Sequence, residues 1–529
     1  MSFTTVQFAI FFAVVFLAYY ALPRKWQWPL LLVASYGFYS AAAPACLVYL
    51  FATTLVTYLG AFAIDANLKK QKAYIKARGA SLSRDEKKSY KAGQEKKRKL
   101  VVALVAIFVL GLLGVFKYSA FFLENIKWFA RCMGRGNISL TISLMLPIGL
   151  SFYIFQSLGY CIDVYREEVP SERNFFKHAL FVSYFPQVLQ GPIGNYGRLA
   201  PQFFAGHDFD YEKVVFGAQR IAWGLFKKFM IANMIVDCIN PVWSNVGDYP
   251  GFICWAAILF LYSIQLYADF SGYMDIACGC SQMLGVNLDE NFQTPYFAKS
   301  IAEFWRRWHI TLGEWFKNYL FYPLLRSEWN NSLRKKLSSS TPKHIANAIP
   351  TALALFIVWV LIGLWHGAAW SYVLYGLFHG SFIIIGVLLD PLYAHFHSSF
   401  PRLCASRIYS LFQILRTFSI VTIGYAIFKP ADLSATCEIM RQMFSAIDGG
   451  GIYQIQYTLH HSFIKVFCWI AFMLVVDVIH YTKPKGTIRA WVHNLHWYVR
   501  WPVYILGIWL VIFYGLYGSG FEQFEYFKF

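Results

Sequence analysis

The chain has 529 residues, of which 57% are hydrophobic, 19% aromatic and 14% charged. This composition excludes a string of soluble domains and predicts an all-α polytopic membrane protein. The formal net charge of +19 agrees with basic cytoplasmic loops beside anionic lipid, so we expect membrane lipids as neighbours and no nucleic-acid partner.

The membrane-spanning segments are predicted from their length, because a spanning helix needs about 20 predominantly apolar residues. Two further apolar stretches, 178–195 and 280–325, are broken by proline, glycine and charge, and we expect them to be re-entrant or interfacial and to line a cavity. The first span lacks a basic leader region and a cleavage site, which favours a retained helix. The predicted spans are 4–22, 27–44, 46–64, 100–118, 140–162, 214–238, 252–275, 350–367, 371–389, 406–428, 461–480 and 501–518.

The distribution of lysine and arginine predicts the orientation of the chain. Arg24 and Lys25 follow the first span, and 69–99 is strongly basic, so we expect both on the cytoplasmic side, with 69–99 as a basic loop. Alternation then places the N-terminus and the C-terminal tail, 519–529, outside. On this count His309 lies in a cytoplasmic-side segment and His366 lies further outward, whereas the broken segments within 178–345 leave the helix count there open.

The cysteines predict neither a disulfide framework nor a metal site. There are ten of them, spread over the chain, and Cys278 and Cys280 stand too close together for a zinc-binding pair. We therefore expect no bound metal and no resident cofactor.

Two histidines are the first candidates for chemistry. His366 ends an almost wholly apolar run, and His309 ends a cluster of aromatic residues and arginines. Ionisable groups at membrane depth are costly and usually functional, and an imidazole titrates near neutral pH. An interfacial histidine whose ring bonds a backbone carbonyl is an equally good interpretation of His366 taken alone.

Other polar residues allow a structural interpretation as well. Asp269 and Asp275 lie in an apolar surround, where their simplest role is to neutralise nearby arginines. The segment that holds Arg306 and Arg307 also carries tryptophans at helical spacing, Trp305, Trp308 and Trp315, and by itself it describes an interfacial helix with an aromatic belt.

Several short motifs follow one another along the chain: Asp-Phe-Ser-Gly-Tyr-Met-Asp at 269–275, Glu-Asn-Phe at 290–292, Phe-Trp-Arg-Arg-Trp-His-Ile-Thr-Leu at 304–312, Tyr-Leu-Phe-Tyr-Pro-Leu at 319–324 and Leu-Trp-His-Gly at 364–367. Upstream lie Pro147–Tyr153, Asp163–Arg166 and Phe185–Ile193. In combination, these motifs resemble the membrane-bound O-acyltransferase family, within it the branch of alginate O-acetyltransferases and teichoic-acid D-alanyl transfer proteins. The resemblance extends over nearly the whole chain.

The resemblance implies a single membrane domain over 1–529, with its catalytic core at 140–430. It implies a ring of about 11–13 membrane helices with re-entrant segments around a central tunnel. The family's catalytic histidine corresponds to His366, and its second histidine corresponds to His309. The residues expected to bind the donor or line the tunnel are Trp305, Arg306, Arg307, Trp308, Asn291, Asp269 and Trp365.

The C-terminal tail resembles that of the small helper peptide of teichoic-acid D-alanylation. The shared pattern is Phe-x-Tyr-Phe at 524–527, which implies that Tyr526 carries the acyl group as a relay. The alternative is a frayed aromatic end that lies on the lipid headgroups. One departure from the alginate-type pattern, Leu325 and Arg326 in place of a glycine pair, puts alginate itself in doubt as the acceptor.

The expected function is therefore transfer of an acyl group, most simply acetyl, from a cytoplasmic thioester to an extracellular or cell-wall polysaccharide. The donor is acetyl-CoA or an acyl carrier protein thioester, and the expected partner is an extracytoplasmic second acyltransferase resembling serine hydrolases. D-alanyl transfer to teichoic acids is the alternative chemistry. A transporter of an acylated precursor would predict inverted repeats, and the sequence shows no repeat. A structural assembly scaffold is the third class, which would leave the histidines replaceable.

Overall fold

The computed structural model describes residues 2–78, 81–135, 139–142, 144–249, 251–430, 433–445, 463–483 and 486–517. Over these residues the chain is helical, with one isolated antiparallel bridge between Phe292 and Trp308 and no strand. The all-α prediction is confirmed. The chain forms two compact units, the first from Met1–Gly217 with Cys280–Asp289 and the second from Ala218–Gly279 with Glu290–Phe529.

The first unit contains the N-terminal helices and is dominated by a long helical hairpin. Two helices, α9 (Tyr211–Phe226) and α11 (Phe252–Met283), begin in one unit and end in the other. The elements of the first unit are α1 (Val6–Ala21), α2 (Arg24–Ala42), η1 (Pro44–Cys46), α3 (Leu47–Arg78), α4 (Arg84–Leu113), the π-helical turn η2 (Gly114–Tyr118), α5 (Ser119–Cys132), α6 (Leu150–Tyr165), α7 (Phe175–Ser183) and α8 (Tyr196–Ala205).

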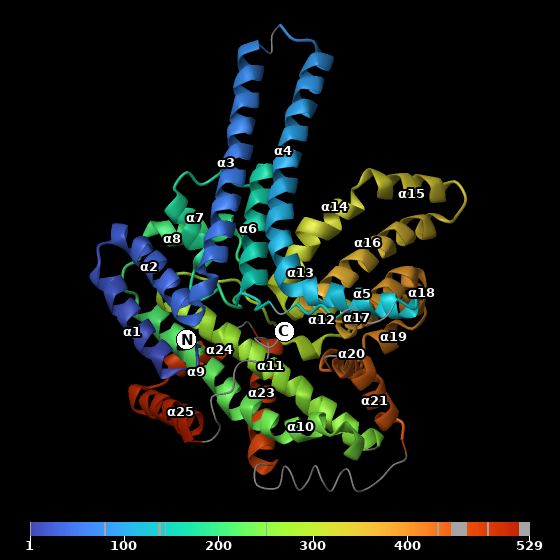
Figure 1. Ribbon diagram of the computed structural model, residues 1–529. Coiled ribbons are helices and arrows are strands. Elements are labelled where there is room, and N and C mark those ends of the chain that lie inside the picture. The colour runs from blue at the N-terminus through green and yellow to red at the C-terminus, as the bar shows by residue number, and fades with distance from the viewer. Residues whose placement is uncertain are drawn as a thin grey trace. The chain divides into compact units, whose positions relative to one another are not determined.

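The hairpin of α3 and α4 carries most of the basic block at 69–99, and the two helices run side by side in Figure 1. That block is therefore largely helical, where the sequence suggested a loop. A capping box at Ser83 starts α4, and the rings of Tyr74 and Tyr90 stack 4.2 Å apart across the seam. The buried guanidinium of Arg98 donates to Asn67 across the same seam. These contacts explain how so charged a segment holds two helices.

The second unit contains the elements on which both candidate histidines lie. Its elements are the π-helical turn η3 (Lys227–Asn233), α10 (Met234–Ser244), η4 (Val246–Asp248), η5 (Pro295–Phe297), α12 (Ile301–Arg307), α13 (Ile310–Phe316), the π-helical turn η6 (Lys317–Phe321), α14 (Tyr322–Leu325), α15 (Glu328–Ser338), α16 (Lys343–His366), α17 (Trp370–Leu388), α18 (Asp390–Ser399), α19 (Pro401–Cys404), α20 (Arg407–Phe428), α21 (Leu433–Met443), α23 (Phe463–Thr482), α24 (Thr487–His493) and α25 (Trp497–Tyr517).

The helices α16 and α17 approach each other so closely that their backbones touch. A Cβ atom built on Gly363 would lie 2.5 Å from the carbonyl oxygen of Tyr372, and one on Gly376 would collide with the carbonyl oxygen of Trp359. Small residues at four-residue spacing, here Gly376 and Gly380, allow such contact between membrane helices. The contact fixes the end of α16, where His366 lies, against α17.

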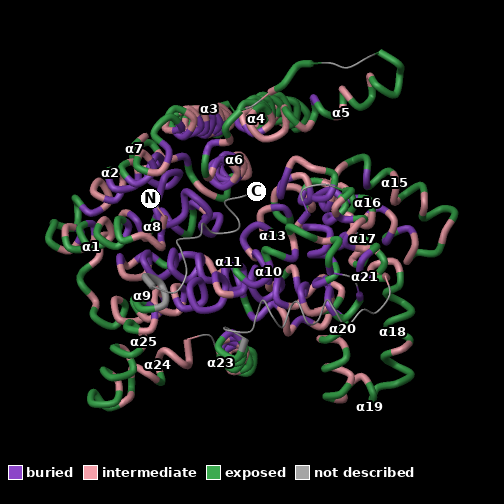
Figure 2. Tube along the Cα trace, turned by 60° about the horizontal axis from the view of Figure 1, so that its bottom comes forward, coloured by how far each residue is buried: buried purple, intermediate pink, exposed green. Residues whose placement is uncertain are grey.

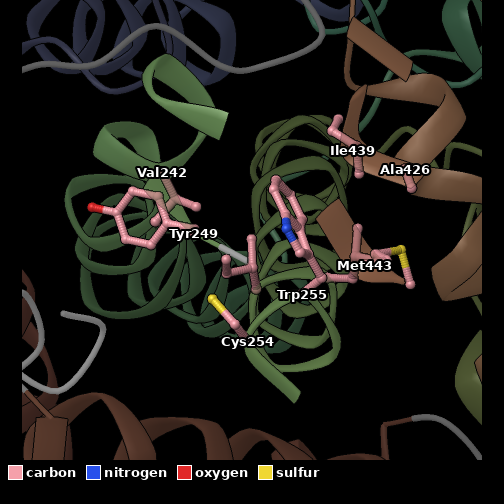
Figure 3. Close-up of a cluster of buried hydrophobic side chains, with 9 residues drawn as sticks. Val242, Tyr249, Cys254, Trp255, Ala426, Ile439 and Met443 are labelled. Carbon is pink, nitrogen blue, oxygen red and sulfur yellow. The ribbon is translucent and has the colours of Figure 1, made fainter. Parts of the chain in front are cut away.

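A hydrophobic cluster holds α20 and α21 against α10 and α11. Figure 3 shows it around Trp255, which is fully buried, with Ala426 of α20 and Met443 of α21 at its edge. Figure 2 shows α11 buried along most of its course. The cluster thereby fixes the C-terminal end of α20. The last residue of that helix, Phe428, packs on His366.

The structure confirms a multi-pass membrane protein and changes several of the predicted spans. The span expected at 140–162 forms helix only from Leu150, and the one at 214–238 is interrupted by η3, where two buried lysines follow each other. The stretches 178–195 and 280–325 are broken into short helices and irregular chain, as their composition predicted. Among the described residues, seven helices are long and apolar enough to cross a membrane: Pro44–Arg78, Arg84–Cys132, Phe252–Met283, Lys343–His366, Trp370–Leu388, Arg407–Phe428 and Ile464–Thr482.

The backbone contact between α16 and α17 makes a prediction about two glycines of the same helix. Gly376→Ala should lower the thermal stability of the detergent-solubilised protein, because the added methyl meets the carbonyl of Trp359. Gly386→Ala is the matched control, since a Cβ there has no atom within 4 Å, and helix propensity favours alanine by up to ~1 kcal/mol. Equal melting temperatures for the two variants would contradict the proposed role of the contact.

Candidate active site

His366 is the last residue of α16 and is buried, with 4% of its surface exposed. Its imidazole packs between aromatic rings from two other helices, with the ring of Tyr375 on α17 5.9 Å away and that of Phe428 on α20 5.4 Å away. The next residue, Gly367, is extended, and a Cβ there would collide with the ring of Tyr372. A glycine is therefore required where the chain turns from α16 into α17.

His309 lies in a sharp turn between α12 and α13, and its side chain is also buried. It has a left-handed backbone conformation with φ of 48°, which is uncommon for a residue with a side chain and costs about 1–3 kcal/mol. Asn291 stabilises the turn from the facing segment. Its carbonyl oxygen accepts from the Ile310 amide at 3.1 Å, and its side-chain oxygen accepts from the Thr311 amide at 2.9 Å.

The two histidines approach each other through the indole of Trp365. The ring of His309 lies 5.6 Å from that of Trp365 and 4.9 Å from that of Phe270, and Trp365 precedes His366 in the chain. The structure thus places both predicted histidines in one aromatic cluster, although 56 residues lie between them in the sequence.

The tryptophans of the Phe304–Leu312 motif have different surroundings. Trp308 is buried and packs on Phe292 and Phe304, so its place is in the packed interior. Trp305 points to α16 and α17, where its ring lies 5.1 Å from that of Trp359 and 5.2 Å from that of His379. Of the two, Trp305 is the one that extends the histidine cluster.

The two arginines of the same motif lie away from the histidine rings. Arg306 is exposed. Arg307 forms an ion pair with Glu303 one turn earlier, at 2.8 Å, and also donates to the Thr294 hydroxyl at 3.2 Å. Its guanidinium lies over the ring of Tyr481. The geometry therefore gives Arg307 a role in holding the segment before His309 and gives neither arginine a contact with His309 or His366.

Asp269 belongs to a buried set of ion pairs. Its carboxylate lies 2.7 Å from the ammonium of Lys228, and both side chains are almost completely buried. Next to this pair, Asp275 accepts from Lys227 at 2.6 Å and from Arg220 at 2.9 Å, and Arg220 also binds Glu290. Neutralisation of the two aspartates, the simplest interpretation of the sequence, is what the geometry shows, with lysines as the main partners.

The ion pairs depend on a close approach of α9 and α11. A Cβ on Gly224 would lie 2.6 Å from the Gly272 carbonyl oxygen, and one on Gly272 would lie 2.9 Å from that of Gly224. Because the backbones nearly touch there, the lysines at the start of η3 reach the aspartates of α11. Both lysines lie in the π-helical turn η3, and both are buried.

The electrostatics of the cluster favour a neutral imidazole at His309. Burial lowers the pKa of His309 to about 3, so its ring is uncharged at neutral pH. A neutral N–H in a dry environment stabilises developing negative charge by a hydrogen bond and not as a cation. His366 and His309 together can therefore supply a base and a hydrogen-bond donor.

Several residues of the cluster were not predicted from the sequence. Tyr375, Phe428 and His379 lie in apolar runs and look like ordinary core residues until the helices are packed. The signal for His379 was present, because it is a further histidine within an apolar span. The lysine pair Lys227 and Lys228 carried a similar signal, being two charges inside a predicted span. Tyr526 lies outside the described residues.

Comparison with known proteins shows the family of this chain. Residues 164–341 match the family model of the membrane-bound O-acyltransferases. A probable alginate O-acetylase of Pseudomonas aeruginosa is 32% identical over 447 residues, which cover 84% of this chain and 75% of that protein. The chain belongs to the membrane-bound O-acyltransferase family. It is accordingly a multi-pass membrane enzyme that transfers acyl groups to hydroxyls.

Two other relatives show the range of acceptors within the family. A peptidoglycan O-acetyltransferase of Helicobacter pylori is 30% identical over 374 residues, which cover 65% of this chain and 64% of that protein. A teichoic acid D-alanyltransferase of Bacillus subtilis is 26% identical over 303 residues, which cover 54% of this chain and 69% of that protein. The branch inferred from the motifs is confirmed.

The buried ion pairs predict a strong asymmetry between single and double substitutions. Lys228→Met should destabilise the protein by roughly 3–5 kcal/mol, because it removes the cation from a buried carboxylate. Adding Asp269→Asn should recover most of this loss, since no unbalanced charge then remains. Thermal unfolding of the solubilised single and double variants measures the difference. A double variant no more stable than Lys228→Met would refute the pairing.

Proposed function

We propose that this O-acyltransferase moves an acetyl group from a cytoplasmic thioester across the membrane to O-acylate an extracellular or cell-wall polysaccharide. The observation that carries the proposal is the aromatic cluster that joins His366, Trp365 and His309. The relatives support the acetyl group, because the alginate and peptidoglycan enzymes among them are named as O-acetylating.

In the proposed reaction, His366 is the general base. A hydroxyl oxygen attacks the thioester carbonyl, and the imidazole takes the hydroxyl proton as the new C–O bond forms. The tetrahedral intermediate then expels the thiolate, which takes the proton from His366 and leaves as a thiol. A positioned base of this kind contributes about 10²–10⁴-fold to the rate. Its place at the C-terminal end of α16 puts the partial negative charge of the last helical carbonyls near the ring.

His309 is proposed to position the donor or to stabilise the oxyanion of the intermediate. Its ring is neutral, and Asn291 holds the strained turn around it by accepting three hydrogen bonds, one from Ile310 and two from Thr311. Such preorganisation is what transition-state stabilisation requires, because the donor does not need to reorient during the reaction. Asn291 and Arg307 act indirectly in this scheme, by fixing the backbone on either side of His309.

Tyr526 is proposed as the first acceptor of the acyl group. An aryl ester has a leaving group of pKa about 10, lower than that of a sugar alcohol, so onward transfer to a polysaccharide hydroxyl is downhill. The second transfer would be made by a separate extracytoplasmic acyltransferase with a serine nucleophile. The scheme requires both termini outside the cell membrane and the basic block at 69–99 inside, as the charge distribution predicts.

The proposed donor is acetyl-CoA or a carrier-protein thioester. Acetyl-CoA and a carrier-protein thioester share the phosphopantetheine arm, and both are anionic, which suits a basic cytoplasmic face. D-alanyl transfer is the second candidate, because a relative carries that name.

The role of His366 is tested by replacing it. His366→Ala should reduce acylation of the polymer by at least about 100-fold, because the general base is lost. His344→Ala is the control on the same helix. The ring of His344 forms a hydrogen bond with the Leu388 carbonyl oxygen, and His344 lies near the opposite end of α16 from His366. Acylation is measured as ester content of the isolated polymer, with membrane levels of each variant checked by immunoblot. Undiminished acylation in His366→Ala would reject the mechanism.

The relay is tested at the C-terminal tail. Tyr526→Phe keeps the ring and removes the nucleophilic oxygen, so polymer acylation should fall to background while the protein remains in the membrane. Mass spectrometry of the tail peptide of the unaltered protein should show an adduct of about 42 Da for acetyl or about 71 Da for D-alanyl, each a proton replaced by the acyl group. Full acylation by Tyr526→Phe would eliminate the relay and spare the enzyme.

A further inference from the structure

A row of polar side chains follows one face of α17, in a helix that is otherwise apolar. Ser371, Tyr375 and His379 succeed one another at four-residue spacing, which places them on the same side of the helix. All three are buried, and Ser371 and His379 have no exposed surface. The ring of Tyr375 lies between the two histidines, 5.9 Å from that of His366 and 4.7 Å from that of His379.

His379 is enclosed by aromatic rings, and its hydrogen-bonding capacity is unused. Within the described part of the chain, neither ring nitrogen has a hydrogen-bond partner. A neutral imidazole has one donor and one acceptor, and leaving a buried polar atom unsatisfied costs about 1–3 kcal/mol. The indole N–H of Trp305 is likewise buried without a partner among those residues, and the two rings are 5.2 Å apart and nearly perpendicular.

The fold reserves space for this imidazole. A Cβ atom built on Gly424 of α20 would lie 2.7 Å from the Nε2 atom of His379, closer than side chains approach one another. The ring therefore fits only because the facing residue is a glycine. An apolar side chain would fill the same space without the cost of unsatisfied nitrogens. A histidine at this position is therefore costly unless a polar group binds to its nitrogens.

The surroundings limit what that group can be. The rings that pack on His379 belong to Trp305, Trp359, Tyr375 and Phe378, and none of them carries a charge. A phosphate or carboxylate would lack a counter-ion there. A neutral group with both a carbonyl oxygen and an N–H, such as an amide, would satisfy the imidazole and the indole together.

From this geometry we infer that His379 and Trp305 form a binding site for a neutral amide of the acyl donor's pantetheine arm. This inference rests on the proposed function, because the donor is taken to be a pantetheine thioester that reaches His366. His379 acts as a positioning residue: it holds the arm, and Tyr375 separates it from the base. Its loss should weaken donor binding and leave the chemistry at His366 intact.

The decisive variant is His379→Phe, which keeps an aromatic ring, one atom larger, and removes both nitrogens. We expect the KM for acetyl-CoA to rise about tenfold, the worth of roughly one hydrogen bond, with kcat within about threefold of the unaltered enzyme. Binding of S-acetyl-pantetheine, the arm shared by both donor classes, should weaken by a similar factor. The melting temperature should be unchanged or higher, because unsatisfied buried nitrogens are removed.

Two further variants separate this site from packing and from the catalytic base. His379→Gln retains a donor and an acceptor, so it should restore most of the affinity for acetyl-CoA and S-acetyl-pantetheine. His366→Ala should lose turnover and keep the affinity for S-acetyl-pantetheine. If His366→Ala retains full turnover while His379→Phe still raises the KM, the proposed base fails and the donor site stands. If His379→Phe leaves both KM and S-acetyl-pantetheine affinity unchanged, or the unaltered protein does not bind that arm, the donor site is overturned.

Discussion

The direct backbone contact between α16 and α17 is the constraint on which the candidate site depends. Because Gly363 and Gly376 carry no side chains, the two helices pack at a distance at which the end of α16 meets the face of α17. His366 is thereby surrounded by Tyr375 and Phe428, and its neighbour Trp365 reaches His309. Between membrane helices, where lipid is as apolar as the side chains, close packing of this kind is the main source of association.

A second close contact, at Gly224 and Gly272, organises the charges of the same unit. It allows Lys227 and Lys228 to reach the carboxylates of α11, so that ionic groups which would be costly in a dry interior are neutralised in pairs. Charge in this unit is thus used to hold α9, η3 and α11 together. The aromatic cluster around the histidines contains no such pair among the described residues.

The comparison of His309, His366 and His379 shows how three similar residues acquire different roles. His309 is fixed by the backbone through a strained turn held by Asn291, and His366 is fixed by its place at the end of a helix. His379 lies in mid-helix, enclosed by rings, with space provided by Gly424. A base, an oxyanion donor and a site for the donor arm are the roles that these three environments suit.

The sequence alone determined the membrane class and the family, and it indicated His309 and His366 as candidates for the site. Hydrophobic length depends only on composition, and the motifs around His309 and His366 are contiguous, so neither needs knowledge of the packing. Tertiary structure decided which polar residues serve the site. Asp269 and Arg307 proved to be paired with Lys228 and Glu303, and His379 entered the cluster, because contacts between distant segments depend on how glycine-containing helices pack and not on spacing along the chain.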